Sequence, residues 1–173
     1  MKFYFSFFIF IFSFCFVQAQ AEYEISKDPK NPEVTIYRGT INKYLLQNTP
    51  EFNKWYVMNQ QGYTPDSSLL NTFERNKAKL QFVIFAGTWC DDTQYILPKF
   101  FKLQELAGVP DSVITLFGAD RKKRALGHIA EAFNINAVPT IIIMKEGKEI
   151  GRVAEYGKTG KWDKELADII NHF

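Results

Sequence analysis

The chain has 173 residues, 46% of them hydrophobic, which is enough apolar material for one folded domain with a sizeable core. Its formal net charge is only +2, and the one basic cluster, residues 121–124, has no interleaved aromatic residues. This balance argues against a nucleic-acid-binding surface, and we interpret the cluster as a solvated loop or the start of a helix.

The N-terminus has the pattern of an export signal. One basic residue precedes an almost uninterrupted apolar run at 3–17, and the small residues Ala19 and Ala21 follow it. The run is shorter than the roughly 20 residues that a membrane-spanning helix needs. We therefore expect residues 1–19 to form a signal peptide, cleaved after Ala19 or Ala21. The mature protein would be periplasmic or secreted, with no stable membrane anchor; an uncleaved anchor is the alternative.

Export would change the cysteine count. Cys15 lies in the apolar run and would leave with it, so Cys90 would be the single cysteine of the mature protein. An exported protein meets an oxidising environment, yet this one could form no internal disulfide. A lone thiol there is either buried and inert or exposed and reactive.

Residues 22–68 are expected to form an N-terminal extension with a short strand and helices. The polar segment 22–32 suggests an irregular lead-in, and the alternation of apolar and polar residues over 34–41 predicts a strand. Pro50 after Thr49 marks a helix start. Gly62 should end that helix, and Thr-Pro-Asp at 64–66 should open a second one.

From residue 80 onward, strands and helices are expected to alternate. The apolar run 80–86 is typical of a strand buried on both faces. The spacing of apolar residues, turn residues and Pro98 then predicts a helix over 91–107, a strand over 112–118, a helix over 124–133, strands over 138–144 and 149–153 joined by a turn, and a helix over 162–170. This order predicts an α/β fold with a mixed central sheet flanked by helices.

The sequence Trp89-Cys90-Asp91-Asp92-Thr93 places a cysteine where the 80–86 strand gives way to a helix. The free N–H groups and the dipole at a helix N-terminus favour a thiolate, and Thr93 could donate a hydrogen bond to the sulfur. Asp91 and Asp92 stabilise the helix start but repel the thiolate. We expect a reactive cysteine with a limited thiolate fraction at neutral pH.

Several features in this order resemble the thioredoxin-like superfamily. They are a buried strand ending in Trp89-Cys90, the spacing of Pro98 from that motif, Val138-Pro139-Thr140 at the start of a strand, and the hairpin sequence over 145–151. The resemblance implies a single thioredoxin-like domain over 69–173, preceded by the extension over 22–68.

The resemblance also implies a substrate site. In that superfamily the proline matching Pro139 is cis and lies against the active-site cysteine, here Cys90. The residue before it, here Val138, offers backbone groups to an extended substrate, and we place Trp89 and Thr140 in the same candidate substrate-binding set. Without the Trp-Cys motif, Pro139 would be interpreted as an ordinary strand-initiating proline.

Two departures narrow the implied chemistry. Thr93 stands where the superfamily has its second cysteine, and Ile84 stands where it has a buried carboxylate. Cys90, assisted by Thr93, would then form mixed disulfides that an external thiol must release. The leading hypothesis is an exported monothiol protein of thiol–disulfide exchange and redox homeostasis, acting on a thiol- or disulfide-containing client protein or a small thiol.

Two alternatives stay open. The chain could be a non-catalytic binding module that keeps the scaffold, because fold does not imply function. It could also be a glutathione-peroxidase-like thiol peroxidase, because Cys-x-x-Thr resembles a peroxidatic segment and peroxide oxidises such thiols to sulfenic acid. We expect no cofactor, and no metal site, since one cysteine and the scattered His128 and His172 do not give ligand spacing.

Overall fold

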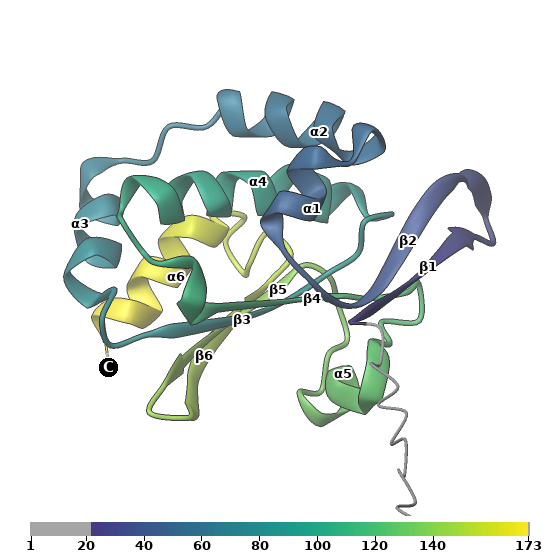
Figure 1. The fold of residues 1–173 in the computed structure, drawn as a ribbon. Coiled ribbons are helices and arrows are strands. Elements are labelled where there is room, and N and C mark those ends of the chain that lie inside the picture. Colours follow the sequence, from purple (N-terminus) through teal and green to yellow (C-terminus); the bar gives the residue numbers. More distant parts are fainter. Residues whose placement is uncertain (1–21, 173) are drawn as a thin grey trace, which may run out of the picture.

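The computed structural model describes residues 22–172, which form a six-stranded sheet of order β1-β2-β4-β3-β5-β6 with helices on both faces (Figure 1). The α/β fold with a mixed sheet is therefore confirmed. The expected signal peptide and Cys15 lie outside the described residues. The strands are β1 (Tyr23–Asp28), β2 (Asn31–Ile41), β3 (Gln81–Ala86), β4 (Ile114–Gly118), β5 (Thr140–Lys145) and β6 (Lys148–Ala154). The helices are α1 (Lys43–Asn48), α2 (Pro50–Gln61), α3 (Ser67–Asn76), α4 (Asp91–Leu106), α5 (Ile129–Ala132) and α6 (Trp162–Asn171), with 3₁₀ turns at Asp111–Val113 and Leu126–His128.

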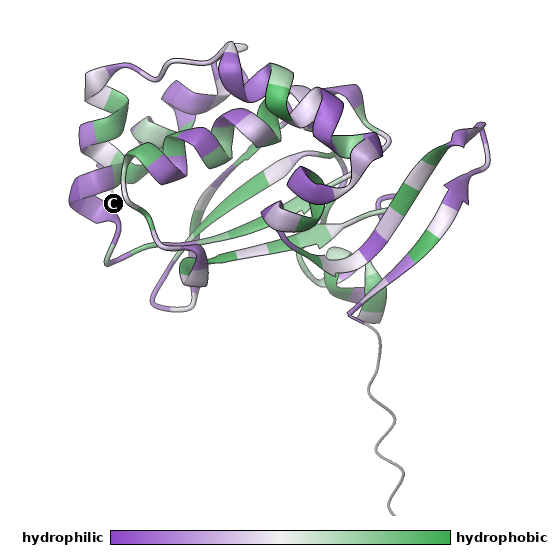
Figure 2. Cartoon of the chain, turned by 45° about the horizontal axis from the view of Figure 1, so that its top comes forward, coloured by the Kyte–Doolittle hydropathy of each residue, from purple (hydrophilic) through white to green (hydrophobic). Residues whose placement is uncertain are grey.

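The centre of the sheet is apolar because its strands are covered on both faces. β3 pairs in parallel with β4 and antiparallel with β5, and the register sets Ile84 opposite Leu116 and Ile141. The remaining neighbours pair antiparallel. Hydrophobic residues dominate the central strands in Figure 2, as expected for buried strands.

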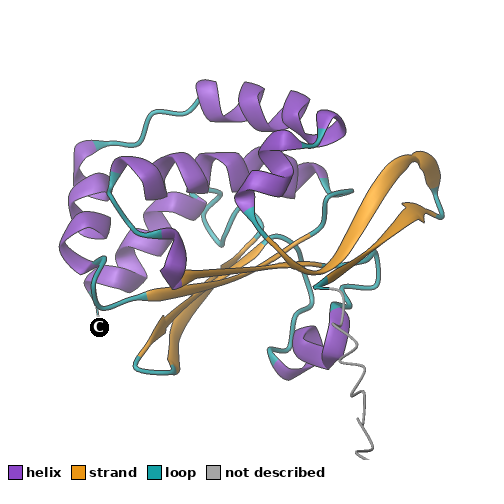
Figure 3. Cartoon of the chain, viewed as in Figure 1, coloured by secondary structure: helices purple, strands orange, loops and turns teal. Residues whose placement is uncertain are grey.

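Two layers of helices cover the sheet. Helices α1, α2, α3, α4 and α6 lie on one face and α5 lies on the other (Figures 1 and 3). The main core lies under the five helices, and a smaller one is built around Phe85, Ala130 and Ile142. Tyr37 of β2 and Phe52 of α2 join the main core, with their ring centroids 5.2 Å apart. Residues 22–68 are therefore part of the same sheet and core.

The expected irregular lead-in at 22–32 is wrong. This segment forms β1 and the turn to β2, with Tyr23 opposite Gly39 and Ile25 opposite Tyr37. Four of the six β1 residues are exposed, so the apolar alternation that signals a half-buried strand is missing. β2 is longer than the strand expected at 34–41. Helix α1, which we did not predict, is capped by the Asn42 side chain, 2.9 Å from the Leu45 N–H that donates to it.

The expected helix over 124–133 is also wrong. Gly127 and His128 have φ values of +65° and +57°, which lie outside the right-handed helical region. They leave a 3₁₀ turn followed by the four-residue α5. Two expected strand starts, at 112 and 138, move to Ile114 and Thr140, after a 3₁₀ turn and a cis proline respectively. The helix after Cys90 is confirmed and continues through Pro98.

Three loops meet at the end of the sheet where β3 and β4 finish. They are the turn from β3 into α4, the loop over 119–125 after β4, and the segment that leads into β5. Within the described residues, no helix is long and apolar enough to cross a membrane.

Candidate active site around Cys90

Cys90 is the N-cap residue of α4, directly before the helix begins at Asp91. Its backbone N–H donates to the Gly87 carbonyl at 2.9 Å, and its own carbonyl accepts from the Gln94 N–H at 3.0 Å. The side chain is half-buried and carries the only free thiol of residues 22–172. The tight turn therefore holds a partly accessible sulfur at a helix N-terminus.

The segment before β5 packs directly on this sulfur. The Val138–Pro139 peptide bond is cis, and the Cys90 thiol donates to the Val138 carbonyl at 3.2 Å. The Thr140 hydroxyl donates to the Ala137 carbonyl at 2.8 Å. Val138, Pro139 and Thr140 are all buried, so Thr140 shapes the loop from inside. What the loop can offer a client is backbone.

The Thr93 hydroxyl is used differently from our expectation. Thr93 is only 1% exposed, and its oxygen accepts a hydrogen bond from the Gly87 N–H at 3.2 Å. The structure pairs Thr93 with the turn and the Cys90 sulfur with Val138, in place of the expected hydrogen bond from Thr93 to the sulfur. Ile84, completely buried, fills the main core. Thr93 therefore acts on Cys90 through the shape of the turn.

Trp89 is fixed from two sides. Its indole N–H donates to the Ala119 carbonyl at 2.9 Å, and the guanidinium carbon of Arg121 lies 4.6 Å from the ring centroid. A side chain at Gly87 would begin 2.8 Å from the indole, so this position needs glycine for the close approach. An Arg at this distance from an indole makes a cation–π contact.

Arg121 links the motif to the N-terminal hairpin formed by β1 and β2. Its Nε lies 2.7 Å from each carboxylate oxygen of Asp28, and a second guanidinium nitrogen also contacts that group. The Asp28 side chain is completely buried. The hydrogen bond from Arg121 holds the pKa of Asp28 below its usual range despite that burial. The basic cluster lies in a loop, as one of our two interpretations expected, but Arg121 within it is half-buried and paired.

Acidic and aromatic residues also lie near Cys90. Asp91 is exposed and Asp92 is half-buried in the first turn of α4. Burial and the nearby Asp92 carboxylate raise the pKa of Tyr156, which follows β6. The ring centroids of Tyr95 and Tyr156 lie 5.8 Å apart. The two residues are 45% and 37% exposed, respectively. They present a partly apolar surface beside the thiol.

An open cleft of about 430 Å³ runs past the sulfur. It is lined by Asn31, Val34, Trp89, Cys90, Asp91, Asp92 and Arg121. The motif forms one side, the N-terminal hairpin forms the other, and Arg121 lies between them. The Cys90 sulfur is therefore accessible from a cleft with one wall built by β2.

A profile of the thioredoxin family matches residues 66–171. This chain belongs to the thioredoxin family. It is 33% identical over 99 residues to thioredoxin H2-2 of Oryza sativa subsp. japonica, covering 57% of this chain and 65% of that protein. It is 32% identical over 75 residues to thioredoxin-1 of Saccharomyces cerevisiae, covering 43% and 67% respectively.

One solved structure shares the fold over a longer stretch than the family match. A protein of unknown function from Pseudomonas aeruginosa is 17% identical with a TM-score of 0.50, over 75% of this chain and 84% of that chain. A Schistosoma mansoni thioredoxin is 30% identical with a TM-score of 0.40, over 62% and 91%. The family match begins at residue 66, so the hairpin wall of the cleft lies outside it.

Sequence reasoning missed three residues of this site: Asp28, Arg121 and Tyr156. Asp28 and Arg121 are 93 positions apart, and only the pairing of β2 with β4 brings their loops together. The only sequence signal for this contact is the opposite charge of Asp28 and Arg121, and many other acidic and basic residues of the chain share it. Among residues 22–172, no cluster of three or more His, Cys, Asp and Glu could hold a metal ion. His128 and His172 are exposed.

Proposed function

We propose that this thioredoxin-family protein acts in thiol–disulfide exchange through Cys90 as its single nucleophile. The observation that carries the proposal is the placement of one partly exposed thiol at the N-terminus of α4, against the Val138 carbonyl and beside an open cleft. Thr93 occupies the position from which a second thiol would resolve the product.

The reaction begins when the Cys90 thiolate attacks one sulfur of a client disulfide. A new sulfur–sulfur bond joins Cys90 to the client, and the other client sulfur leaves as a thiolate that takes up a proton. With no resolving cysteine, the adduct then has two fates. A second thiol of the client can attack it, which isomerises the client without net oxidation or reduction.

The other fate uses a small external thiol. Its thiolate attacks Cys90, releases the client as a thiol and leaves Cys90 joined to the small thiol. A second small thiol then frees Cys90 and forms the small-molecule disulfide. Two external thiols are thus oxidised for each client disulfide reduced. Turnover therefore depends on the concentration of that thiol.

The client contacts follow from the geometry of the cleft. Trp89 lines the cleft beside Cys90, and the Val138 carbonyl lies against the sulfur. The half-exposed Tyr95–Tyr156 pair lies on and after the elements that flank this site. This set suits an extended protein segment that contains a cysteine or disulfide, and it also admits a small thiol. Asp91 and Asp92 disfavour the thiolate, so the helix N-terminus must offset their charge.

The proposal is tested with a peptide containing one disulfide, using wild type and Cys90→Ser. Without added thiol, we expect wild type to accumulate one adduct per chain and then stop. With added glutathione, peptide reduction should proceed at a rate that rises with the glutathione concentration. Sustained reduction by Cys90→Ser, or no adduct on wild type, would contradict the proposed function.

We further infer that the protein is exported after removal of its first residues. The apolar run at 3–17 and the small residues at Ala19 and Ala21 support this. Expression of the full chain followed by intact-mass analysis should give a mature protein that begins at Gln20 or Glu22. Recovery of only the uncleaved chain from the membrane fraction would overturn the inference.

A further inference from the structure

We propose that Arg121, anchored by Asp28 of the N-terminal hairpin, is the positioning residue that stabilises the Cys90 thiolate, which makes the hairpin a working part of the active site. The proposal rests on the proposed function, because it concerns the reactivity of the same sulfur. It assigns a role to a segment outside the family match.

Acidic and polar groups surround Cys90 on several sides. Asp91 and Asp92 face it from α4, Tyr156 faces it from the segment after β6, and the Val138 carbonyl faces it from the loop before β5. A thiolate there adds negative charge to a site that already contains two carboxylates. Arg121 is the one cationic side chain among the residues that line the cleft.

Arg121 and Cys90 line the same cleft. The guanidinium carbon lies 4.6 Å from the ring centroid of Trp89, the residue that directly precedes Cys90. A positive charge near a thiol favours the ionised form. Arg121 lines the same cleft as Asp91 and Asp92, whose carboxylates would otherwise disfavour a thiolate at Cys90.

The position of Arg121 is fixed by two partners, Asp28 and Trp89. The Nε–H of Arg121 donates to both carboxylate oxygens of Asp28, each at 2.7 Å. The guanidinium stacks on the indole of Trp89. Asp28 is completely buried, and a buried carboxylate is costly without such a partner. The Asp28–Arg121 pair therefore holds the guanidinium beside the Cys90 motif and keeps it from swinging out toward the solvent.

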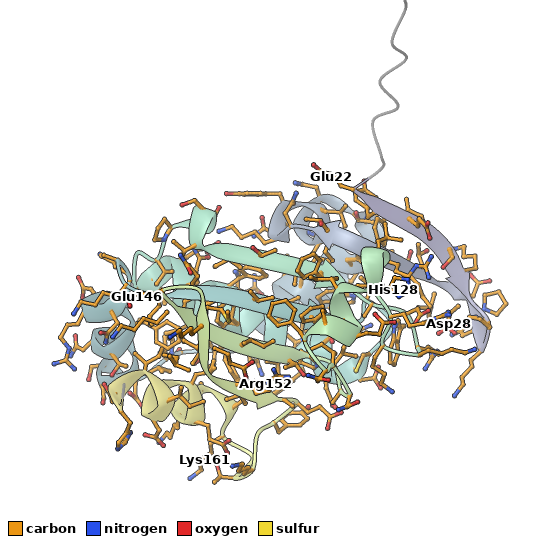
Figure 4. All side chains as sticks on the ribbon, turned by 90° about the horizontal axis from the view of Figure 1, so that it is seen from below. Glu22, Asp28, His128, Glu146, Arg152 and Lys161 are labelled. Carbon is orange, nitrogen blue, oxygen red and sulfur yellow. The ribbon has the colours of Figure 1, made fainter. Side chains whose placement is uncertain are left out.

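The hairpin is also attached to the motif itself. The Thr88 hydroxyl, two residues before Cys90, donates to the Thr35 carbonyl at 2.8 Å and accepts from the Tyr37 N–H at 3.4 Å. Asn31 and Val34 of the same strand line the cleft. Asp28 lies at the turn of the hairpin between β1 and β2 (Figure 4). The contacts of β2 with Thr88 therefore help to hold Asp28 in place relative to Cys90.

The test measures the pH dependence of Cys90 alkylation by iodoacetamide in wild type, Arg121→Gln and Arg121→Lys. Arg121→Gln should slow alkylation at pH 7 about three- to tenfold and move the midpoint of the profile to higher pH, because a shift of one pH unit changes the thiolate fraction about tenfold. Arg121→Lys keeps the charge and should restore much of the rate.

Arg124→Gln is the matched control. Arg124 is in the same loop and is also paired with an aspartate, but it does not line the cleft. It removes the same charge from the chain, and we expect its alkylation profile to match that of wild type. Equal slowing by Arg124→Gln and Arg121→Gln would show a general charge effect and overturn the assignment.

The role of Asp28 is tested by a double-mutant cycle. Asp28→Asn should change the alkylation profile when Arg121 is present and have no further effect in the Arg121→Gln background, because Asp28 acts only through Arg121. An equal effect in both backgrounds would overturn the positioning role. Circular dichroism and thermal unfolding of each variant identify any effect due to loss of fold.

The outcomes separate this inference from the proposed function. If Arg121→Gln alkylates as wild type does while wild type still forms the peptide adduct, the positioning role fails and the exchange function stands. If wild type alkylates rapidly and Arg121→Gln slowly, but no peptide adduct forms, the positioning role stands and the exchange function fails.

Discussion

A buried threonine, Thr93, occupies the position where the dithiol route would place its second cysteine. Thr93 is 1% exposed, and its hydroxyl accepts from the Gly87 N–H inside the turn that carries Cys90. It therefore contributes to the geometry of the nucleophile but offers no sulfur. On the proposed function, the chemistry at Cys90 would stop at a mixed disulfide unless another thiol arrives.

Replacing Thr93 with cysteine should restore an internal resolving step. In the presence of excess dithiothreitol, we expect Thr93→Cys to reduce a disulfide peptide at least about tenfold faster than wild type, because an adjacent thiol attacks the adduct intramolecularly. The rate is measured by peptide release, and the trapped adduct should fall correspondingly.

Thr93→Ser serves as the control, because it keeps a hydroxyl that can accept from Gly87. It should behave as wild type in both measurements. If Thr93→Cys traps as much adduct as wild type and shows no faster release, position 93 does not face the adduct, and our interpretation of the motif is wrong.

Residue identity alone revealed only part of this site. The motifs at Trp89-Cys90 and Val138-Pro139 predict the candidate nucleophile, and the cis form of Pro139, which the family resemblance implied, is confirmed. The contact between Arg121 and Asp28 does not, because it depends on how two loops 93 positions apart are placed by the sheet. Local patterns identify what a residue can do, whereas distant partners come from tertiary packing.

At the scale of elements, the N-terminal extension supports both the core and the cleft. α2 packs Phe52 and Tyr56 into the main core, while β2 pairs with β4 and reaches the Cys90 motif. Phe52 is 1% exposed, and Met58 on the same helix is 66% exposed. The two faces of α2 therefore contribute very differently to stability.

Phe52→Ala should lower the free energy of unfolding by about 3–5 kcal/mol, because it removes a buried aromatic side chain and leaves a cavity. Met58→Ala, on the exposed face, should change the same quantity by no more than about 0.5 kcal/mol. Urea unfolding of both variants measures the difference. Equal, small effects would show that α2 is not part of the cooperative core.

Gly118 tests the junction between the hairpin and the rest of the sheet. A Cβ at this position would lie 2.2 Å from the Tyr37 carbonyl oxygen, so Gly118→Ala must push β2 away from β4. We expect a loss of about 1–3 kcal/mol in the free energy of unfolding, together with a changed Cys90 alkylation rate.

Gly62→Ala provides the comparison for Gly118→Ala. Its Cβ would meet nothing nearer than 3.7 Å, and its backbone is not left-handed. The free energy of unfolding should stay the same or rise slightly, because alanine restricts the unfolded chain. If both variants behave alike, the close contact between Gly118 and Tyr37 does not constrain the hairpin.

Elements were predictable where burial imposes a period. β3, α4 and α6 were predicted because each carries a strong apolar pattern. β1 was missed because most of its residues are exposed, and the expected helix at 124–133 failed at two residues with positive φ. β1 carries no periodic apolar signal, and at 124–133 the apolar spacing is present but does not reveal the positive φ of Gly127 and His128.

Across the whole molecule, stability is tied to ionised carboxylates. Hydrogen bonds from Arg121 to Asp28, from Lys43 to Asp111 and from the Lys158 backbone to Glu165 each hold the carboxyl pKa below its usual range. A depressed pKa contributes stability above the pKa of the unfolded chain, and that stability is lost as pH falls through the folded-state value.

We therefore expect the free energy of unfolding to be nearly constant from neutral pH down to the ordinary carboxyl range at about pH 4, and to fall below it. Asp28→Asn should be less stable than wild type at pH 7 and should lose part of this acid dependence. Urea unfolding at several pH values measures both effects. A parallel pH dependence in wild type and Asp28→Asn would contradict the role of the Asp28–Arg121 pair.

At this scale the architecture was predictable, and the integration of the extension was not. The alternating order of strands and helices led to the mixed sheet. No local pattern showed that residues 22–68 would add two strands to its edge and form one wall of the cleft.

We propose above all that Cys90 is a reactive monothiol in this setting. The most direct measurement is the rate at which reduced protein forms an adduct with a disulfide peptide at pH 7, compared with an unstructured peptide that contains one cysteine. We expect faster adduct formation on Cys90, with one adduct per chain that persists until thiol is added and none on Cys90→Ser. A rate no higher than that of the unstructured peptide would contradict it.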